Sequence, residues 1–446
     1  MSGKSQDKRS VQPVHPGGVW WRPANALRYD EVMKNVQRRS GAFTFFLILA
    51  AFPTATPAFE AIDTLAWPSR GVYPAYPRED DRPTDFWVQG GVRRDDNALR
   101  VETGEQSDLV TRLGVGVRHE TRLVGRQRVR LDARGDYYDY DKLTELDHFA
   151  YAVAGDWLWE IGNNFSGSVL VGQDRRQIDI SETQTERLDT ATSTRLAGTA
   201  AYLVSPRFRI RGGLAASKSE REEERDTETR SASAVAGMDY VSPLGNTLGF
   251  EFRRTQGQVP TDEFVAGVGF VNNDYDENEV SLVATYALGT QLRSGVRVGR
   301  TSRKYDQVTA RDFDGNTGRI FLDWLPGNKT ILGFEAYHEP RSVVDIAASH
   351  VVFTGVVFGP RWAVTNKVVL SARFVRENRK YEGDPALAAG GVLRDEDLSL
   401  VRFAVGWEPQ RRWQLSAAVD RGERESNIAG RDYNYAAVMG NVAWVW

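Results

Sequence analysis

Apolar and polar residues alternate along the chain from about residue 85 to the C-terminus, in segments separated by Gly, Pro, Asn and Asp. Alternation with a period of two places successive side chains on opposite faces of a β-strand. In the last segment, Val438, Val442, Trp444 and Trp446 share one face and Asn441 lies on the other. The pattern predicts eighteen strands, with cores near 85–94, 108–119, 126–138, 147–159, 164–174, 193–204, 206–217, 231–242, 246–256, 278–288, 291–303, 317–325, 328–338, 349–359, 366–377, 397–408, 412–423 and 433–446.

The connections between these strands alternate in length. Short turns follow even-numbered strands, as at 204–206 and 326–328, whereas long polar loops such as 217–231 and 256–276 follow odd-numbered ones. An even strand number with short turns at one end is typical of an outer-membrane β-barrel whose termini both lie in the periplasm. The segments also reach the roughly nine to eleven residues that a tilted strand needs to cross a bilayer. We therefore predict an all-β fold, a transmembrane antiparallel up-and-down barrel.

The two faces of the predicted strands differ in charge. Arg128, Arg130 and Arg134 alternate with Val129 and Leu131, for example. A basic side chain facing lipid near the bilayer midplane costs roughly 2–4 kcal/mol, so we expect the charged faces to line the lumen. A water-soluble barrel would need the reverse arrangement, with an apolar interior.

A lumen rich in arginine attracts anions and binds carboxylates through the planar guanidinium group. The alternative is an ionic mesh, in which arginines and acids on neighbouring strands neutralise one another and fill the interior. The sequence leaves both possibilities open. The candidate anion path consists of Arg112, Arg118, Arg126, Arg128, Arg130, Arg134, Arg207, Arg209, Arg211, Arg293, Arg297, Arg319, Arg373 and Arg402. The inward acids that offset it are Asp132, Asp136, Asp156, Glu251, Asp323, Glu335 and Asp420.

Two aromatic residues end the chain. Tryptophan is favoured at the membrane–water interface, so we expect Trp444 and Trp446 to lie there. We also expect them to serve as the C-terminal signal that the barrel assembly machinery recognises. The last strand should then pair with the first, because a barrel must close.

The chain has 446 residues, a net charge of -3 and no cysteine, so a disulfide framework and thiolate chemistry are excluded. Its one strongly apolar run, Ala42 to Phe52, follows basic residues such as Arg39 and leads to small residues near Ala58, as in a secretory signal peptide. The preceding residues do not resemble a signal peptide, and Met33 is a natural start. We divide the chain into an N-terminal extension with signal peptide (1–58), a Pro-rich periplasmic leader (59–84) and the barrel (85–446).

No pattern of catalytic or metal-binding residues emerges from the sequence. The histidines are scattered, and His148, beside Asp147, has no serine at a diagnostic spacing. The segments 139–141 and 312–315 contain acids but not the full calcium-loop pattern, and we interpret them as turns. We expect no enzymatic activity, no cofactor and no metal.

Several short motifs near the strand ends together resemble a known family. They are Arg93-Arg94-Asp95-Asp96-Asn97, Tyr138-Asp139-Tyr140-Asp141-Lys142, Leu146-Asp147-His148, Trp157-Leu158-Trp159, Arg311-Asp312-Phe313-Asp314-Gly315, Tyr381-Glu382-Gly383-Asp384-Pro385, Ser426-Asn427-Ile428 and Arg431-Asp432-Tyr433. In order and spacing the chain resembles the outer-membrane β-barrels of exopolysaccharide loci, the EpsL type within the putative β-barrel porin 2 group. Most of the motifs should lie at the outer rim.

The resemblance implies an outer-membrane protein that takes part in making or exporting extracellular polysaccharide. Combined with a basic lumen, it predicts that an acidic polysaccharide passes outward through the barrel. The alternatives are a scaffolding barrel closed by its own salt bridges and a general anion porin. The expected partners are the polysaccharide, outer-membrane lipid, the barrel assembly machinery and periplasmic export components, and we expect no nucleic acid.

Overall fold

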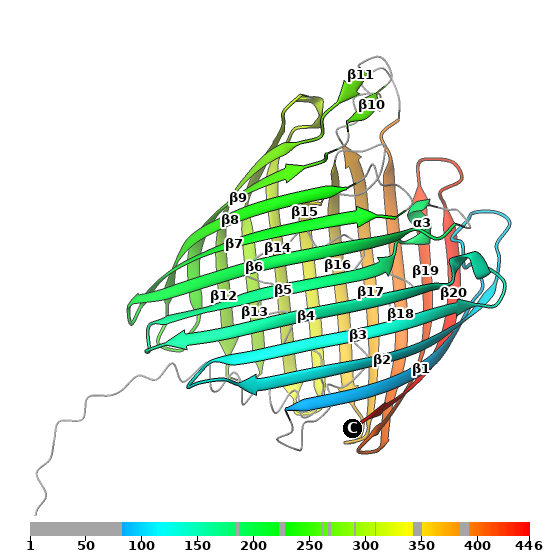
Figure 1. Cartoon of the computed structure of the whole chain (residues 1–446), viewed down its shortest axis with the longest axis horizontal. Helices are drawn as coiled ribbons and strands as arrows, with labels where there is room; N and C mark the ends of the chain where they lie inside the picture. The colour runs from blue at the N-terminus through cyan, green and yellow to red at the C-terminus, as the bar shows by residue number, and fades with distance from the viewer. Residues whose placement is uncertain are drawn as a thin grey trace, which may run out of the picture.

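The chain forms a closed barrel of eighteen antiparallel strands in which each strand pairs with its neighbours in the sequence (Figure 1). The structure is a computed structural model that describes residues 83–183, 187–222, 228–260, 262–265, 269–289, 291–307, 309–341, 350–382 and 392–446. The predicted N-terminal extension, signal peptide and nearly all of the leader lie outside these residues. The predicted fold class and the number of barrel strands are confirmed.

The strands are 12 to 16 residues long, more than the roughly nine to eleven residues that cross a bilayer. The barrel strands are β1 (Thr84–Asp95), β2 (Asp108–Arg122), β3 (Arg128–Tyr140), β4 (His148–Ile161), β5 (Phe165–Gln177), β6 (Thr190–Ser205), β7 (Phe208–Arg221), β8 (Thr229–Val241), β9 (Thr247–Gln258), β12 (Tyr275–Leu288), β13 (Leu292–Tyr305), β14 (Phe313–Gly327), β15 (Thr330–Arg341), β16 (His350–Ala363), β17 (Val368–Glu382), β18 (Asp395–Gln410), β19 (Trp413–Ser426) and β20 (Tyr433–Val445). We call the end that carries the long connections the loop end and the other the turn end.

Short elements interrupt the loops at the loop end. The sequence did not predict them, because each is only three or four residues long. They are η2 (Thr144–Leu146), α3 (Ile180–Thr183), η4 (Thr309–Arg311) and the two-stranded hairpin of β10 (Glu263–Val265) and β11 (Gly269–Val271). None of the helices in the described ranges is long and apolar enough to cross a membrane.

The barrel closes between its first and last strands. β1 and β20 pair antiparallel from Trp87–Val445 to Asp95–Ala437. Beyond this ladder, Phe86 and Trp446 exchange two backbone hydrogen bonds of 3.0 Å each, and their rings stack at 5.9 Å. The closure leaves no free sheet edge, as a barrel in lipid requires.

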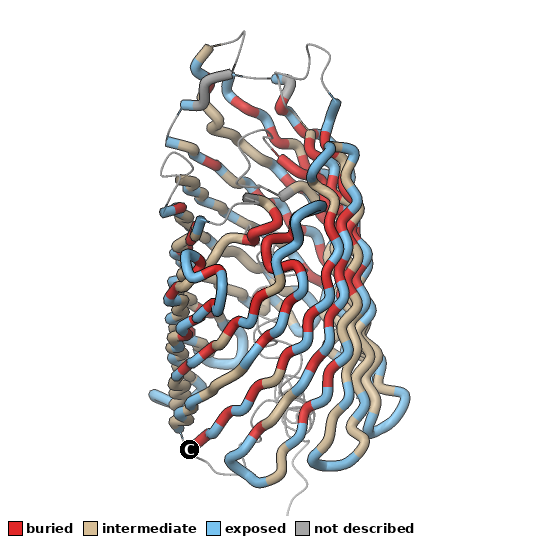
Figure 2. The backbone as a smooth tube through the Cα atoms, turned by 90° about the vertical axis from the view of Figure 1, so that its right-hand side faces the viewer, coloured by how far each residue is buried: buried red, intermediate tan, exposed pale blue. Residues whose placement is uncertain are grey.

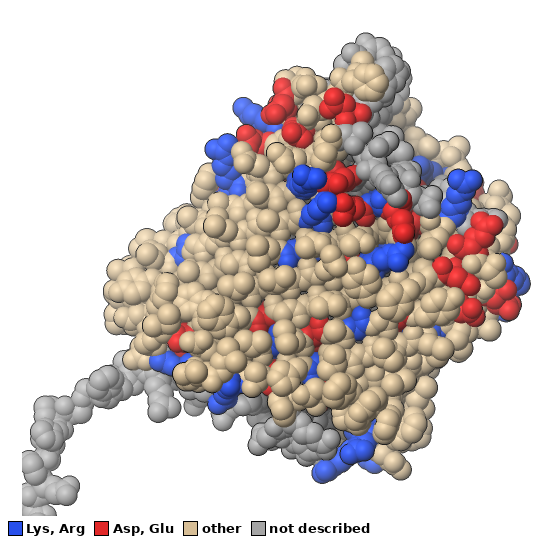
Figure 3. Space-filling model, viewed as in Figure 1, with Lys and Arg blue, Asp and Glu red and all other residues tan. Residues whose placement is uncertain are grey.

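The faces of the strands follow the predicted alternation (Figure 2). Large apolar side chains point outward along the whole wall, including Leu214 and Phe250, each 68% exposed, and Val115, 58% exposed. The face of the outer wall seen in Figure 3 is mostly uncharged, with the larger groups of Lys, Arg, Asp and Glu toward the loop end and smaller ones toward the turn end. Exposed apolar surface on this scale has a physical basis only in contact with lipid.

Two candidate arginines lie in turns rather than on inward strand faces, which corrects the sequence prediction. Arg126 follows Gly125, whose φ of 60° begins a turn in which Gln127 N–H donates to the carbonyl of Val124 at 3.1 Å. Arg207 follows Pro206, which has no backbone N–H to give to a ladder. Strands β3 and β7 therefore each begin two residues later than predicted.

Placing the same charged side chain on either face of one strand tests this arrangement. Leu214→Arg puts a cation on the lipid side near the middle of β7, and we expect it to lower the free energy of unfolding in lipid by about 2–4 kcal/mol. Ala215→Arg places the same side chain on the inward face of the same strand and should cost less. Denaturant titration of both variants in bilayers measures the difference. Equal losses would contradict the assignment of the faces.

Candidate functional site: a charged lumen with a packed loop end

Most candidate arginines face the lumen and are paired with acids. Within the described ranges, at least ten of the fourteen form ion pairs: Arg112 with Asp136, Arg118 with Asp132, Arg126 with Glu160, Arg128 and Arg130 with Glu120, Arg209 with Asp239, Arg211 with Asp239 and Glu251, Arg297 with Glu251 and Glu279, Arg319 with Glu335 and Glu339, and Arg402 with Asp420. Opposite charges thus alternate around much of the inner wall. This is the arrangement that an ionic mesh requires.

Glu251 on β9 shows how the mesh is built. Its side chain is only 2% exposed and pairs with Arg211 on β7, with Arg297 on β13 and, at 2.7 Å, with Arg253 on its own strand. Arg253 and Arg297 each reach Glu279 on β12 at 3.0 Å as well. The Glu251 carboxylate therefore connects three strands, β7, β9 and β13, and Glu279 adds β12 to the mesh. Two-residue spacing on a strand keeps Glu251 and Arg253 on one face.

The other four candidate arginines are placed differently. Arg134 lies on the inward face of β3 and is exposed, so its guanidinium points into the lumen. Arg293 lies 5.3 Å from the centre of the Phe321 ring, and Arg373 lies across the strand pair from Arg402. Arg207 lies in the turn before β7. Of these, Arg134 has the position expected for a residue that meets a passing anion.

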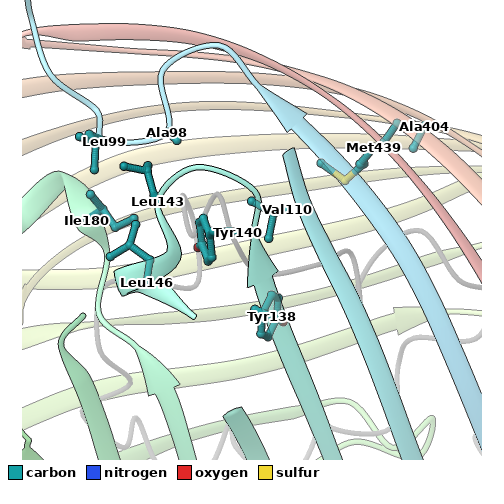
Figure 4. Close-up of a cluster of buried hydrophobic side chains, with 11 residues drawn as sticks. Ala98, Leu99, Val110, Tyr138, Tyr140, Leu143, Leu146, Ile180, Ala404 and Met439 are labelled. Atoms are coloured by element: carbon teal, nitrogen blue, oxygen red, sulfur yellow. The ribbon is translucent and has the colours of Figure 1, made fainter. Parts of the chain in front are cut away.

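Three connections fold together at the loop end. They are the β1–β2, β3–β4 and β5–β6 loops, which contribute Leu99, Leu143, Leu146 and Ile180 to one buried apolar cluster beside Tyr140 (Figure 4). Leu146 is fully buried and Leu99 is 5% exposed. The sequence predicted long polar loops, and it did not reveal that these three carry an apolar core of their own.

The β1–β2 loop is fixed to the inner wall by a buried arginine. Arg100, 2% exposed, donates to both carboxylate oxygens of Asp95 at 2.8 and 2.7 Å, and its guanidinium stacks 3.7 Å from the ring centre of Tyr435 on β20. The backbone of Arg100 has a φ of 56°, a conformation that costs a non-glycine residue about 1–3 kcal/mol. Tyr435 in turn packs over Gly422, where a Cβ would lie 2.2 Å from its ring.

The short helix α3 reaches much farther across the barrel. The Glu182 carboxylate lies 2.9 Å from Arg379 on β17, 3.1 Å from Arg394 just before β18 and 3.7 Å from Arg424 on β19. Counted around the barrel from one strand to the next, β18 lies seven strands from β5, by way of β4, β3, β2, β1, β20 and β19. Two strands directly opposite each other in an eighteen-strand barrel are nine strands apart. The β5–β6 loop therefore crosses the lumen at the loop end. We call Arg379, Arg394 and Arg424 the arginine cage.

The arginine cage also has carboxylates and aromatic rings of its own wall around it. Arg379 pairs with Glu377 at 2.8 Å, and Arg394 pairs with Glu396 at 2.6 Å. An aromatic ring lies beside each guanidinium: the ring centres of Phe353, Tyr381 and Tyr433 are 5.3, 4.0 and 4.7 Å from Arg379, Arg394 and Arg424. Cations held over aromatic rings keep part of their attraction when desolvated.

The electrostatics of the β5–β6 loop depend on this contact. Burial alone would raise the pKa of Glu182, but Arg379, Arg394 and Arg424 outweigh it and lower the pKa from 4.5 to about 2. Asp179, three residues earlier, has no such partner at bonding distance among the described residues. Burial raises the pKa of Asp179, and the nearby charge of Glu182 raises it further. Glu182 is therefore the ionised group through which the loop binds the far wall.

The sequence analysis did not identify Glu182 or the arginine cage. The only available signal was the spacing of opposite charges two residues apart, Glu377 with Arg379 and Arg394 with Glu396, which places both on one strand face. His148 has a structural role: its ring stacks on Tyr138 at 4.8 Å and contacts the carbonyl of Leu146 at 2.8 Å. In the described part of the chain, no cluster of His, Asp and Glu is suited to a metal ion.

Part of the chain matches a family model, and the chain is similar to several solved structures. Residues 283–444 match the model of the family described as Putative beta-barrel porin 2. No curated protein matches the chain. Among solved structures, the chain is similar to the outer membrane protein OpdK from Pseudomonas aeruginosa, with 11% identity, 81% of this chain and 99% of that chain covered, and a TM-score of 0.45. It is also similar to OccK2 (OpdF) of the same organism in complex with glucuronate, with 11% identity, 82% of this chain and 98% of that chain covered, and a TM-score of 0.45. A BenF-like porin from Pseudomonas fluorescens Pf-5 has 10% identity, with 82% of this chain and 99% of that chain covered, and a TM-score of 0.45.

The closed barrel, its lipid-facing wall and the partial family match define a porin-like barrel of the outer membrane. The long connections then face the outside and the short turns face the periplasm, as the sequence predicted. The EpsL type within the group stays a prediction.

The low pKa of Glu182 predicts how acid acts on the loop. A carboxyl whose pKa is lowered by docking stabilises the docked form above about pH 4.5 and loses this contribution as the pH falls toward 2. We expect pepsin to cleave the loop at 178–183 increasingly over that range, relative to its cleavage of the loop at 427–432 in the same sample. Mass spectrometry of the fragments gives the ratio. A ratio that stays constant between pH 4.5 and 2 would mean that the ionised carboxylate does not hold the loop.

Proposed function

We propose that the protein is a channel that exports an acidic exopolysaccharide across the outer membrane, without catalysing a reaction. The observation that carries this proposal is the arginine cage at the outer mouth, where three guanidinium groups, each beside an aromatic ring, converge on one carboxylate. Arginine binds carboxylates through a planar fork of donors, and aromatic side chains offer a flat apolar face with a polar edge. Together these features suit a chain of sugars that carry carboxylates.

The ionic mesh along the lumen supports passage rather than tight binding. Most inward arginines already have a carboxylate partner, so at these positions a carboxylate of the polymer would exchange with one that is present instead of filling an empty cationic site. Conduction requires binding that is weak and distributed over many sites. The exposed Arg134 adds an available cation within the lumen.

The EpsL resemblance adds the biological context of this proposal. The motifs behind that resemblance contain residues of the packed loop end, among them Asp95, Asn97, Tyr140 and Leu146. Arg431, from another motif, donates to the backbone carbonyl of Glu182 at 3.5 Å. These motif residues thus lie at the mouth through which we propose that the polymer leaves, whereas Trp157-Leu158-Trp159 lies near the turn end of β4.

A second candidate function is a scaffolding barrel that conducts nothing. It is favoured by the same ion pairs, ten of the candidate arginines being paired, and by the packed loops at the mouth. A general anion porin is the third. The three functions differ in what crosses the purified barrel. An exopolysaccharide channel would pass acidic saccharides, a scaffolding barrel would pass no ions, and a general anion porin would pass small anions of any shape.

Ion selectivity tests the lumen. We expect the purified protein in a planar bilayer to pass anions in preference to cations, and Arg134→Glu to shift the reversal potential toward cation selectivity. Arg126→Glu makes the same change of charge in a turn at the periplasmic end and is the matched control. If no current flows through the wild type or the variants, the scaffolding function replaces the channel.

Deleting the gene tests whether the protein exports the polymer. In the native host, an in-frame deletion should remove acidic polysaccharide from the cell surface and leave it in the periplasm, because no other route for it is expected. Fractionation followed by a uronic acid assay measures both pools, with plasmid-borne wild type as the control. Normal surface polymer together with an anion-selective current would identify a general anion porin instead.

A further inference from the structure

Three neighbouring turns at the turn end of the barrel carry exposed cations. They connect β14 to β15, β16 to β17 and β18 to β19, and they follow one another around one sector of the wall because these strands pair in sequence (Figure 1). The cations are Lys329 in the first turn, Lys367 in the second, and Arg411 and Arg412 in the third. The structure describes all residues of these three turns, and none of them is Asp or Glu. We call the four cations the basic arc.

Backbone hydrogen bonds hold the basic arc against the wall. The carbonyl groups of Lys329, Lys367 and Arg412 accept hydrogen bonds from N–H groups of β16, β18 and β20 at 2.7, 2.9 and 2.9 Å. The ammonium group of Lys367 also donates to the carbonyl of Pro409, at the start of the next turn, at 2.8 Å. Neighbouring turns are two strands apart, or about 10 Å. The long side chains of two turns can therefore approach one phosphate group from both sides.

Tryptophans on the lipid-facing side accompany each of these turns. Trp324 lies before the first turn, Trp362 lies before the second, and Trp407 and Trp413 flank the third. Their side chains are 43–49% exposed on the outer wall. Because tryptophan is enriched at the level of the lipid headgroups, these residues mark the surface of the periplasmic leaflet. The basic arc thus lies at the depth of the lipid phosphates.

A groove in the outer wall continues from this sector toward the centre of the bilayer. Its lining includes Phe334 on β15, Val356 and Phe358 on β16, Phe374 on β17 and Val401 on β18. On β16, Phe358 is four residues from Trp362, or about 13 Å along the strand. One leaflet contributes about 15 Å to the hydrocarbon core. The groove therefore lies where the acyl chains of a lipid anchored at the basic arc would end.

We propose that this sector is a binding site for an anionic glycerophospholipid of the periplasmic leaflet. The lipid phosphate lies between cations of neighbouring turns, its glycerol lies level with the tryptophans, and an acyl chain occupies the groove. This site is more specific than the general contact of a barrel with lipid, because the cations, the tryptophans and the groove coincide between β14 and β19. It does not depend on what the lumen conducts.

The distribution of charge favours an anionic headgroup over a zwitterionic one. A zwitterionic lipid would bring an ammonium group to the basic arc, where the turns supply no carboxylate for it. The acids of the adjoining strand ends, Asp323 and Glu408, lie at inward positions of β14 and β18 and so on the other side of the wall. Each Lys or Arg near the membrane surface adds to the attraction for anionic lipid.

Native mass spectrometry of the delipidated full-length protein tests the headgroup site. The probe is dioleoyl phosphatidylglycerol, and dioleoyl phosphatidylcholine is the zwitterionic control. The triple variant Lys329→Gln, Lys367→Gln and Arg412→Gln should lower the affinity for phosphatidylglycerol about ten-fold or more and leave phosphatidylcholine unchanged. The matched control, Arg122→Gln, Arg126→Gln and Arg207→Gln, removes three exposed cations at other turns and should change the affinity less than two-fold.

The other outcomes each overturn the proposal. Equal losses in the two triple variants would mean that phosphatidylglycerol responds only to total charge. Unchanged affinity in both would mean that the basic arc does not bind the headgroup, and equal losses for both lipids would exclude recognition of the anionic charge. If the arc variant instead loses affinity for lipid A but not for phosphatidylglycerol, the ligand is a phosphorylated glycolipid rather than a glycerophospholipid.

Photo-crosslinking in lipid nanodiscs tests the groove. Phosphatidylglycerol with a diazirine at the end of one acyl chain should label peptides that contain Phe358 and Phe374, several-fold more than phosphatidylcholine with the same chain. Val401→Trp fills the groove without changing charge and should reduce this labelling several-fold. Val298→Trp, an outward position on β13 outside the groove, is the matched control. Labelling that is spread evenly around the wall, or that Val401→Trp leaves unchanged, would show that no acyl chain occupies the groove.

Discussion

The structure depends on one constraint: in hydrocarbon, every backbone N–H and C=O group must find a partner within the protein. A sheet meets this requirement only by closing, and the pairing of β1 with β20, extended by the hydrogen bonds between Phe86 and Trp446, completes the closure. Closure fixes one face of every strand toward lipid and the other toward the lumen. The charged side chains on alternate residues therefore face the lumen, because the other face of each strand contacts lipid.

Enclosure makes the inner charges depend on one another. A solvent-exposed arginine does not need an acidic partner, but a buried one does. Arg253, which is 4% exposed, pairs with Glu251 on its own strand and with Glu279 on the next strand. The same rule operates at the mouth, where Glu182 of the β5–β6 loop supplies a carboxylate to the arginine cage. The mesh and the crossing of the lumen are thus two results of neutralising guanidinium groups in a confined space.

The sequence predicted the features that repeat along it and missed those that depend on distant contacts. Alternation gave the eighteen strands and their faces, and failed only near the turns at Arg126 and Arg207, where glycine and proline delay the strands. Pairs such as Glu251 with Arg253 follow from two-residue spacing. No local pattern indicates that Glu182 meets Arg379, nearly two hundred positions later, because that contact depends on the closure of the whole barrel.

The crossing by α3 also affects the mechanics of the wall. Hydrogen bonds in a barrel join only adjacent strands, so they resist separation of neighbours but allow the cross-section to flatten into an ellipse. The contact of Glu182 with Arg379 on β17 and Arg424 on β19 connects the β5–β6 loop to a part of the wall many strands away, across the opening. This contact should resist flattening, so the outer opening should keep a fixed outline.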